Sequence, residues 1–279
     1  GRNGPNAVLD ETEDPFVVVH EAQGSLAGAG TQGELSHVAT NCLMSIMCIA
    51  RFARQELLRA VGALATMITK WDELYDRTCF RINKYMNGST GWRQIGFIGG
   101  APSDLRLGLF SDADFAGDRA GVRSTGGVFL ALYGPHSFFP LSAQSKKQTA
   151  VSHSTVEAEH IAAGQALRTS GLPAIPLWTK ILNRPVALEL YQDNQATGRI
   201  MAIGRAPALR HIKRTRSVSV AWIHERIQSP DVNLHGCVSD VMAADSSTQH
   251  FTSRHKWFSV CSLIGLFPTP SSHYPIQHP

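Results

Sequence analysis

The sequence predicts an α/β fold in which a mixed five-stranded sheet with flanking helices is preceded by a small helical segment. Two observations lead to this prediction. Apolar residues recur at helical spacing between Glu34 and Asn87, whereas short apolar runs punctuated by glycines follow Pro102. Farther along the chain, helix-like and strand-like segments alternate, which is typical of a sheet with helices on its faces.

Composition divides the chain into regions. The first residues are rich in Gly, Asp, Glu and Ala without apolar periodicity, and a turn-rich stretch of glycines lies between Gly88 and Pro102. The second of these is the natural place for a domain boundary. We therefore expect a flexible lead (1–33), a helical segment (34–102), an α/β domain (103–250) and a C-terminal tail (251–279).

The helical segment fits three helices that break near Arg51 and Lys70. One helix face carries regularly spaced apolar residues, namely Leu57, Val61, Leu64 and Ile68. A short strand is expected over Gln94 to Ile98, inside the turn-rich stretch.

The α/β domain opens with three apolar, β-compatible runs that we interpret as antiparallel strands: Leu105 to Asp112, Thr125 to Tyr133 and Ser137 to Ser142. Later strands are expected over Val186 to Gln192 and Val232 to Gly236. Helices are expected over Ser152 to Thr169, Asn194 to Ile203 and Ala208 to Ile227, and from about Ala243.

The composition limits the possible functions. With 279 residues, 43% of them hydrophobic, the chain can bury a real core, but its longest apolar candidate, Cys42 to Ala50, is far too short to cross a bilayer. The five cysteines lack CxxC spacing, so neither a zinc site nor a disulfide framework is predicted. A net charge of +4 permits a polyanionic partner without requiring one. Because the sequence opens with Gly1, we expect a piece of a longer chain.

Four separated acidic residues are the strongest functional signal: Asp112, Glu159, Asp193 and Asp245. They fall in turn on a strand, a helix, a strand end and the terminal helix. Carboxylates that a fold gathers repel one another unless a hard cation neutralises them, so the set predicts metal-assisted phosphodiester cleavage. Taken singly, each acid is more often structural, and Asp193 could simply cap a helix.

Neighbouring acids can be separated by physical arguments. Ser154 and Glu157 have the spacing of a capping box, which explains Glu157 locally. Glu159 lies about 200° from Glu157 around the helix, so it needs another explanation, either a metal or solvent. Asp114 shares a face with Asp112 only if the strand continues, and we favour Asp112 as the ligand.

Several motifs together resemble a known family. In order, SDADFAG, STGG, SKKQTAVSHSTVEAEH, YQDNQA, LRHIKRT and the AAD ending at Asp245 look like the ribonuclease H domain of a copia-type retrotransposon Pol polyprotein. The segment CIARFARQELLRAVGALATMITKW resembles the thumb and connection end of the same element's reverse transcriptase. The resemblance covers about residues 34–266 and implies a ribonuclease H-like fold.

The resemblance implies a two-metal endonuclease that cuts the RNA strand of RNA/DNA hybrids. The residues matching the family's ligands for two Mg²⁺ ions, or Mn²⁺ in their place, are Asp112, Glu159, Asp193 and Asp245. One metal would activate the attacking water while the other stabilises the leaving 3′ oxygen. The implied partner besides the hybrid is the rest of the polyprotein, including the polymerase palm and fingers, with no membrane. The implied location is a cytoplasmic virus-like particle or the nucleus.

Nucleic-acid contacts are predicted at residues beside these motifs: Lys146, Lys147, Asn194, Gln195, Arg210, Lys213 and Arg214. The alternative for the two neighbouring lysines is a solvated turn after a strand, and for the basic run of 205–216 it is a solvated helix face.

One departure from the family pattern concerns the last motif. Where the family carries Ile-Phe-Thr-Lys, this chain has Ser246-Ser247-Thr248-Gln249, and the loss of two apolar anchors predicts a poorly docked last helix and a displaced Asp245. Two alternatives therefore stay open. The chain could be a degenerate, inactive fragment that only binds nucleic acid or a protein partner, or an interaction protein that uses residues 34–87 as its binding surface.

Overall fold

The computed structural model of the chain describes residues 31–115, 123–149, 151–205 and 220–268. Its helices are α2 (Ala39–Phe52), α3 (Leu58–Ala65), α4 (Glu73–Gly88), α5 (Thr155–Ala166), α6 (Leu172–Leu182), α7 (Gln195–Ile203), α9 (Val220–Ile227) and α10 (Arg254–Leu263). Its strands are β1 (Arg93–Gln94), β2 (Phe97–Ile98), β3 (Arg106–Asp114), β4 (Thr125–Gly134), β5 (Ser137–Lys147), β6 (Leu188–Gln192), β7 (Val232–Gly236) and β8 (Leu266–Phe267).

The main sheet is mixed, which confirms the predicted α/β class. Its strand order is β2-β5-β4-β3-β6-β7, with β3, β4 and β5 antiparallel and with β6 and β7 parallel to β3. The sheet has six strands rather than the predicted five, because β2 adds an edge by pairing Phe97 with Phe138 of β5. The strand predicted over Gln94 to Ile98 is split, since β1 pairs instead with β8.

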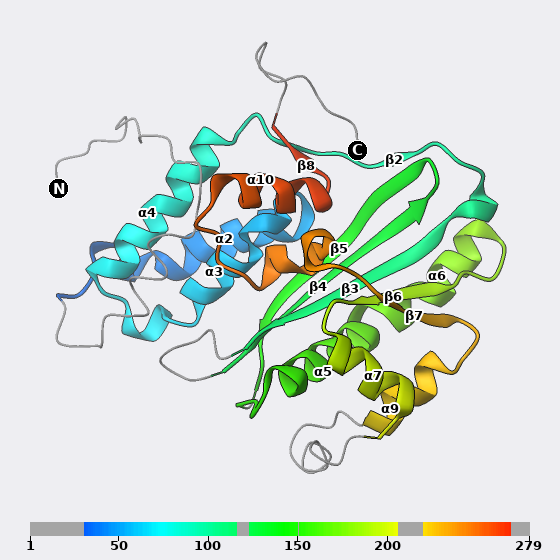
Figure 1. Cartoon of the computed structure of the whole chain (residues 1–279). Coiled ribbons are helices and arrows are strands. Elements are labelled where there is room, and N and C mark those ends of the chain that lie inside the picture. Colours follow the sequence, from blue (N-terminus) through cyan, green and yellow to red (C-terminus); the bar gives the residue numbers. More distant parts are fainter. Residues whose placement is uncertain (1–30, 116–122, 150, 206–219, 269–279) are drawn as a thin grey trace.

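Helices cover both faces of this sheet (Figure 1). In β4, Val128 and Leu130 belong to the buried cluster beneath α5, α6, α7 and α9. Phe129 and Ala131, which point the other way, belong to the cluster formed with α2, α3, α4 and α10. Because β4 is buried on both sides, it has the continuous apolar sequence that was predicted as a strand.

The three predicted helices of the helical segment are confirmed as α2, α3 and α4. Asp72 starts α4, because its side chain accepts hydrogen bonds from the amides of Leu74 and Tyr75. One buried cluster contains side chains of α2, α3 and α4 together with residues of the sheet and Trp257 of α10. The domain boundaries proposed from composition stay predictions, but in the described residues the helical segment and the sheet share this core.

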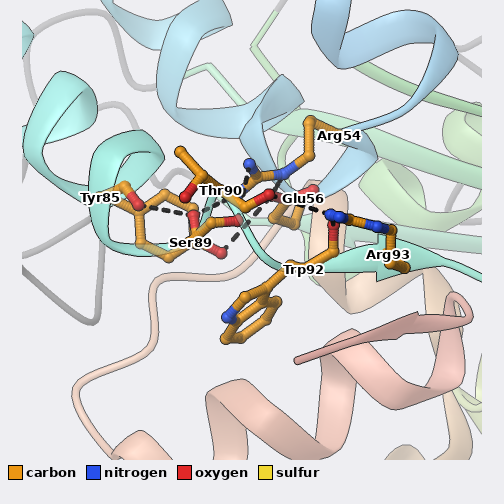
Figure 2. A network of polar contacts seen from close by, with 7 residues as sticks. All are labelled: Arg54, Glu56, Tyr85, Ser89, Thr90, Trp92 and Arg93. Atoms are coloured by element: carbon orange, nitrogen blue, oxygen red, sulfur yellow. Dashed lines mark hydrogen bonds and ion pairs between the residues drawn. The ribbon is translucent and has the colours of Figure 1, made fainter. Parts of the chain in front are cut away.

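A polar network ties the helical segment together (Figure 2). The Arg54 guanidinium donates to Glu56 at 2.6 Å and to the Ser89 hydroxyl at 2.6 Å, and it lies over the ring of Tyr85. Glu56 is fully buried, and this burial raises its pKa although the Arg54 charge opposes the shift. The network therefore joins the start of α3 to the end of α4.

The long helical region after β5 begins as predicted but ends much later. The Ser154 hydroxyl accepts from the Glu157 amide at 3.2 Å, and Glu157 accepts from the His153 amide at 2.8 Å, which confirms the capping interaction. Beyond the predicted end at Thr169, a π-helical turn leads directly into α6. Two prolines early in α6 make this helix hard to predict from sequence.

The helix predicted from Ala243 is wrong. Residues Ala243–Ser247 form only a short 3-10 helix, η8, and the next α-helix, α10, begins at Arg254. The helix predicted over Ala208 to Ile227 is confirmed where it is described, in α9, while residues 206–219 lie outside the described residues. In the described parts of the chain, none of the helices combines the length and apolar character needed to cross a membrane.

Candidate metal centre

Three of the four predicted acids meet at one end of the sheet. Asp112 lies near the end of β3, Glu159 on α5 and Asp193 directly after β6. Each offers a carboxylate oxygen, and these oxygens all lie within 4.8 Å of one another. Residues separated by up to 81 positions in sequence therefore form one cluster, here called the acid cluster.

The sheet register explains why these residues meet. Strands β3 and β6 are parallel, and Phe110 of β3 is paired with Tyr191 of β6. Two residues farther along, on the same face, β3 carries Asp112 and the chain after β6 carries Asp193. Helix α5 packs against β3 and carries Glu159 beside them. The capping bond of Glu157 sets the start of the helix, which in turn fixes the direction in which Glu159 points.

Asp245 lies next to this cluster, on η8, but its carboxylate is not part of the three-residue group. Burial raises the pKa of Asp245 to about 8, and the charges of Asp112 and Asp193 add to this shift. Its Oδ1 atom is buried and has no hydrogen-bond partner among the described residues. A buried carboxylate oxygen without a partner is costly unless a further group, such as a cation, binds it.

The electrostatics of the cluster favour a cation. Burial raises the pKa of Glu159 to about 9, with the Asp112 charge as the next cause, and burial likewise raises the pKa of Asp112. Burial and the nearby aspartates raise the pKa of Cys237 to about 11. Oxygen ligands with mutual repulsion are what hard divalent cations neutralise, so the residues fit a divalent metal site.

Each member of the acid cluster is also held by a neutral donor. The Thr248 hydroxyl donates to Asp112 Oδ2, the Gln192 amide donates to Glu159 Oε2 at 3.2 Å, and the Ser239 hydroxyl donates to Asp193 Oδ2 at 2.9 Å. None of the three donors was predicted as a site residue. Gln192 adjoins Asp193 in the YQDN motif, so adjacency to a ligand was the available signal.

The predicted poor docking of the last motif is wrong. Ser246, Ser247 and Thr248 are fully buried. The Ser145 hydroxyl of β5 donates to the Ser247 carbonyl at 2.7 Å. A side chain at Gly127 of β4 would come within 2.6 Å of the Thr248 methyl group, so the bare glycine backbone lets η8 lie directly on the sheet. The small residues of η8 thus pack closely against Gly127 of β4, and large apolar side chains are not needed to hold η8 on the sheet.

The choice between the two acids of β3 is clearer in the structure. The strand does continue through Asp114, contrary to our expectation. Asp114 nevertheless binds Arg59 of α3 at 3.1 Å, whereas Asp112 is the member of the acid cluster. Asp193 is not a helix cap, because Asn194 caps α7 by accepting from the Thr197 amide at 3.0 Å.

The predicted nucleic-acid contacts are placed unevenly. Lys146 and Lys147 are the last residues of β5 rather than part of a turn, and Lys146 is exposed. Asn194 uses its side-chain oxygen in capping, and Gln195 is exposed at the start of α7. The remaining three, Arg210, Lys213 and Arg214, lie outside the described residues. Their roles stay predictions.

The curated proteins that the chain resembles include two from plants. Over 230 residues, 80% of this chain, it is 27% identical to the retrovirus-related Pol polyprotein from transposon TNT 1-94 of Nicotiana tabacum. Over 225 residues, 79% of this chain, it is 28% identical to the retrovirus-related Pol polyprotein from transposon RE1 of Arabidopsis thaliana. The chain is similar to retrotransposon Pol polyproteins. This confirms the predicted resemblance, although the matches span only 16% and 14% of the relatives' lengths.

Other comparisons are more distant. No family model matches the chain. Among solved structures, a ribonuclease H1 isolated from compost by a metagenomic approach matches 51% of this chain and 92% of its own length, with 15% identity and a TM-score of 0.36. The foamy viral protease-reverse transcriptase, solved in complex with RNA/DNA hybrid, matches 80% of this chain and 27% of its own length, with 11% identity and a TM-score of 0.40.

Proposed function

We propose that the chain is the ribonuclease H part of a retrotransposon Pol polyprotein and cleaves the RNA strand of RNA/DNA hybrids with the help of Mg²⁺. The observation that carries this proposal is the convergence of the Asp112, Glu159 and Asp193 carboxylates from three distant segments. The similarity to two Pol polyproteins supports the choice of a nucleic acid as substrate.

The acid cluster and Asp245 would hold the metal. Burial, and after it repulsion between neighbouring carboxylates, raises the pKa values of Asp112 and Glu159, so a bound ion would stabilise their charged forms. Bound Mg²⁺ ions supply Lewis acidity that activates water and neutralises charge on a phosphodiester. The donors Thr248, Gln192 and Ser239 orient the carboxylates before an ion arrives.

The substrate would approach the end of the sheet where the acid cluster lies. Exposed Lys146 and Gln195 are suited to phosphate or sugar contacts there, as proposed from the sequence. The RNA strand would be distinguished from DNA by its 2′ hydroxyl groups. Partners beyond the hybrid, namely the remaining polyprotein, and the location in a virus-like particle or the nucleus stay predictions of the resemblance.

The test is cleavage of an RNA/DNA hybrid labelled on the RNA strand, compared with double-stranded RNA and double-stranded DNA. The parent protein should cut only the hybrid, only with a divalent metal, and leave 3′ hydroxyl ends. Asp193→Asn should abolish cleavage, because it removes one carboxylate charge while keeping the shape of the side chain. As a control, Asp231→Asn changes an aspartate before β7, outside the acid cluster, and should cut like the parent. Absence of cleavage by folded parent protein would contradict the proposal.

Inactive binding is the alternative that such a failure would favour. Its main argument was the altered last motif; the burial of Ser246 and Ser247 speaks against poor docking of that motif, while the Asp245 carboxylate stays outside the three-residue group. Tight hybrid binding without cleavage would distinguish this alternative from an interaction protein, which should bind no hybrid at all.

A further inference from the structure

Arg59 of α3 reaches from the helical segment to the metal centre. It is only 4% exposed, although arginine is rarely so buried without charged or polar partners. Its Nε donates to the Thr248 carbonyl at 3.1 Å and one terminal nitrogen donates to Asp114 Oδ2 at 3.1 Å. The same nitrogen lies 3.3 Å from His250 Nε2. One side chain therefore joins α3, the end of β3 and the chain that follows η8.

The residue that Arg59 holds is itself bonded to a predicted metal ligand. The Thr248 hydroxyl donates to Asp112 Oδ2, while its carbonyl accepts from Arg59. Thr248 follows η8, which carries Asp245, and the amide of Thr248 donates to the Asp245 carbonyl at 3.1 Å. Fixing Thr248 thus fixes the backbone next to Asp245 and the side-chain orientation of Asp112 at once.

We infer that Arg59 is a positioning residue for the metal centre, acting through Thr248 and Asp114, so that the helical segment is part of the architecture that binds the metal. This inference rests on the proposed metal-dependent function of the acid cluster. Residues that orient metal ligands from behind typically change metal affinity or activity by about 10- to 100-fold when they are removed.

A matched control is available in the same segment. Arg54 is also a largely buried arginine, but its side chain contacts Glu56, Ser89 and Tyr85 rather than residues near the metal centre (Figure 2). Both arginine substitutions should therefore lower the stability of the fold. A loss of metal affinity should follow only from changes at Arg59 or Thr248.

The experiment is calorimetric titration of the full chain with Mg²⁺, without nucleic acid, for the parent and for Arg59→Met, Arg59→Lys, Thr248→Val and Arg54→Met. We expect Mg²⁺ affinity to fall about tenfold or more in Arg59→Met and Thr248→Val, with partial recovery in Arg59→Lys. Arg54→Met should bind Mg²⁺ like the parent. Thr248→Val keeps the size of the side chain, so it serves as the deciding variant if Arg59→Met does not fold.

The inference is overturned if Arg59→Met or Thr248→Val binds Mg²⁺ as tightly as the parent, if Arg54→Met is weakened equally, or if the parent binds no Mg²⁺. Hybrid cleavage measured in parallel separates the two proposals. A parent that binds Mg²⁺ in an Arg59-dependent way but does not cut the hybrid would refute the proposed function and leave this inference standing.

Discussion

The acid cluster should make the metal-free protein less stable at neutral pH, and replacing Glu159 by glutamine should reverse much of that effect. Burial, followed by the Asp112 charge, raises the pKa of Glu159 to about 9 in the folded chain. In the unfolded chain a glutamate titrates near pH 4.3. Because the folded pKa is the higher one, the stability linked to this group is complete below about pH 4.3 and is lost progressively as the pH rises to about 9.

The size of the effect follows from this difference. At pH 7 the carboxyl is protonated in the folded chain and ionised in the unfolded chain. This difference lowers the free energy of unfolding by roughly 4 kcal/mol relative to its value at low pH. Glutamine cannot ionise, so Glu159→Gln removes this cost, but burying its amide offsets part of the improvement. We therefore expect a net stabilisation of about 2 kcal/mol at pH 7. For a chain of this size that corresponds to an increase in Tm of roughly 4 to 8 °C.

The assay is thermal unfolding in EDTA at pH 5 and pH 8, repeated with Mg²⁺. Glu159→Gln should exceed the parent in Tm by more at pH 8 than at pH 5, and it should gain less from Mg²⁺ because one ligand charge is gone. Glu225→Gln, at an exposed position of α9 outside the acid cluster, is the control and should show neither change. A pH-independent difference between Glu159→Gln and the parent would refute the electrostatic argument.

Three further predictions concern local packing and the metal. Gly127→Ala should lower the free energy of unfolding by about 1 to 3 kcal/mol in urea titrations, because the added methyl group would overlap Thr248 and the Ala244 carbonyl. The control Gly198→Ala, in a helix with open space around this glycine, should leave the free energy of unfolding unchanged or raise it. Equal losses of stability in the two variants would contradict the tight packing of η8. Ser154→Ala should cost about 1 kcal/mol through loss of the α5 cap, and an unchanged urea midpoint would count against it. EDTA should abolish hybrid cleavage and Mg²⁺ should restore it, whereas cleavage that persists in EDTA would exclude a metal-dependent reaction.

Local signals in the sequence predicted most of the fold correctly. The α/β class, the three helices of the segment and the cap of α5 each follow from patterns within a few residues. The predictions failed where tertiary contacts decide the outcome. The single strand predicted over Gln94 to Ile98 is split, because Gln94 pairs with β8 and Phe97 pairs with Phe138 of β5, and no local pattern reports those partners. The short η8 replaces a predicted α-helix where the chain lies directly on Gly127.

The candidate site shows the same division. Acidic residues with unexplained positions could be picked from the sequence, and three of them do meet in space. The residues that support these acids could not be identified from the sequence, because Thr248 lies in the motif that was interpreted as altered and Arg59 lies 53 positions before Asp112. The serines that replace apolar residues predicted poor docking, because the sequence does not report that η8 packs against a glycine, Gly127 of β4.

Anomalous diffraction from crystals soaked in Mn²⁺, recorded near the manganese edge, shows whether the acid cluster holds a divalent metal. We expect an anomalous peak bounded by the carboxylates of Asp112, Glu159 and Asp193, and loss of that peak in crystals of Asp193→Asn. Crystals in which Mn²⁺ binds elsewhere on the chain while the acid cluster shows no anomalous density would contradict this expectation.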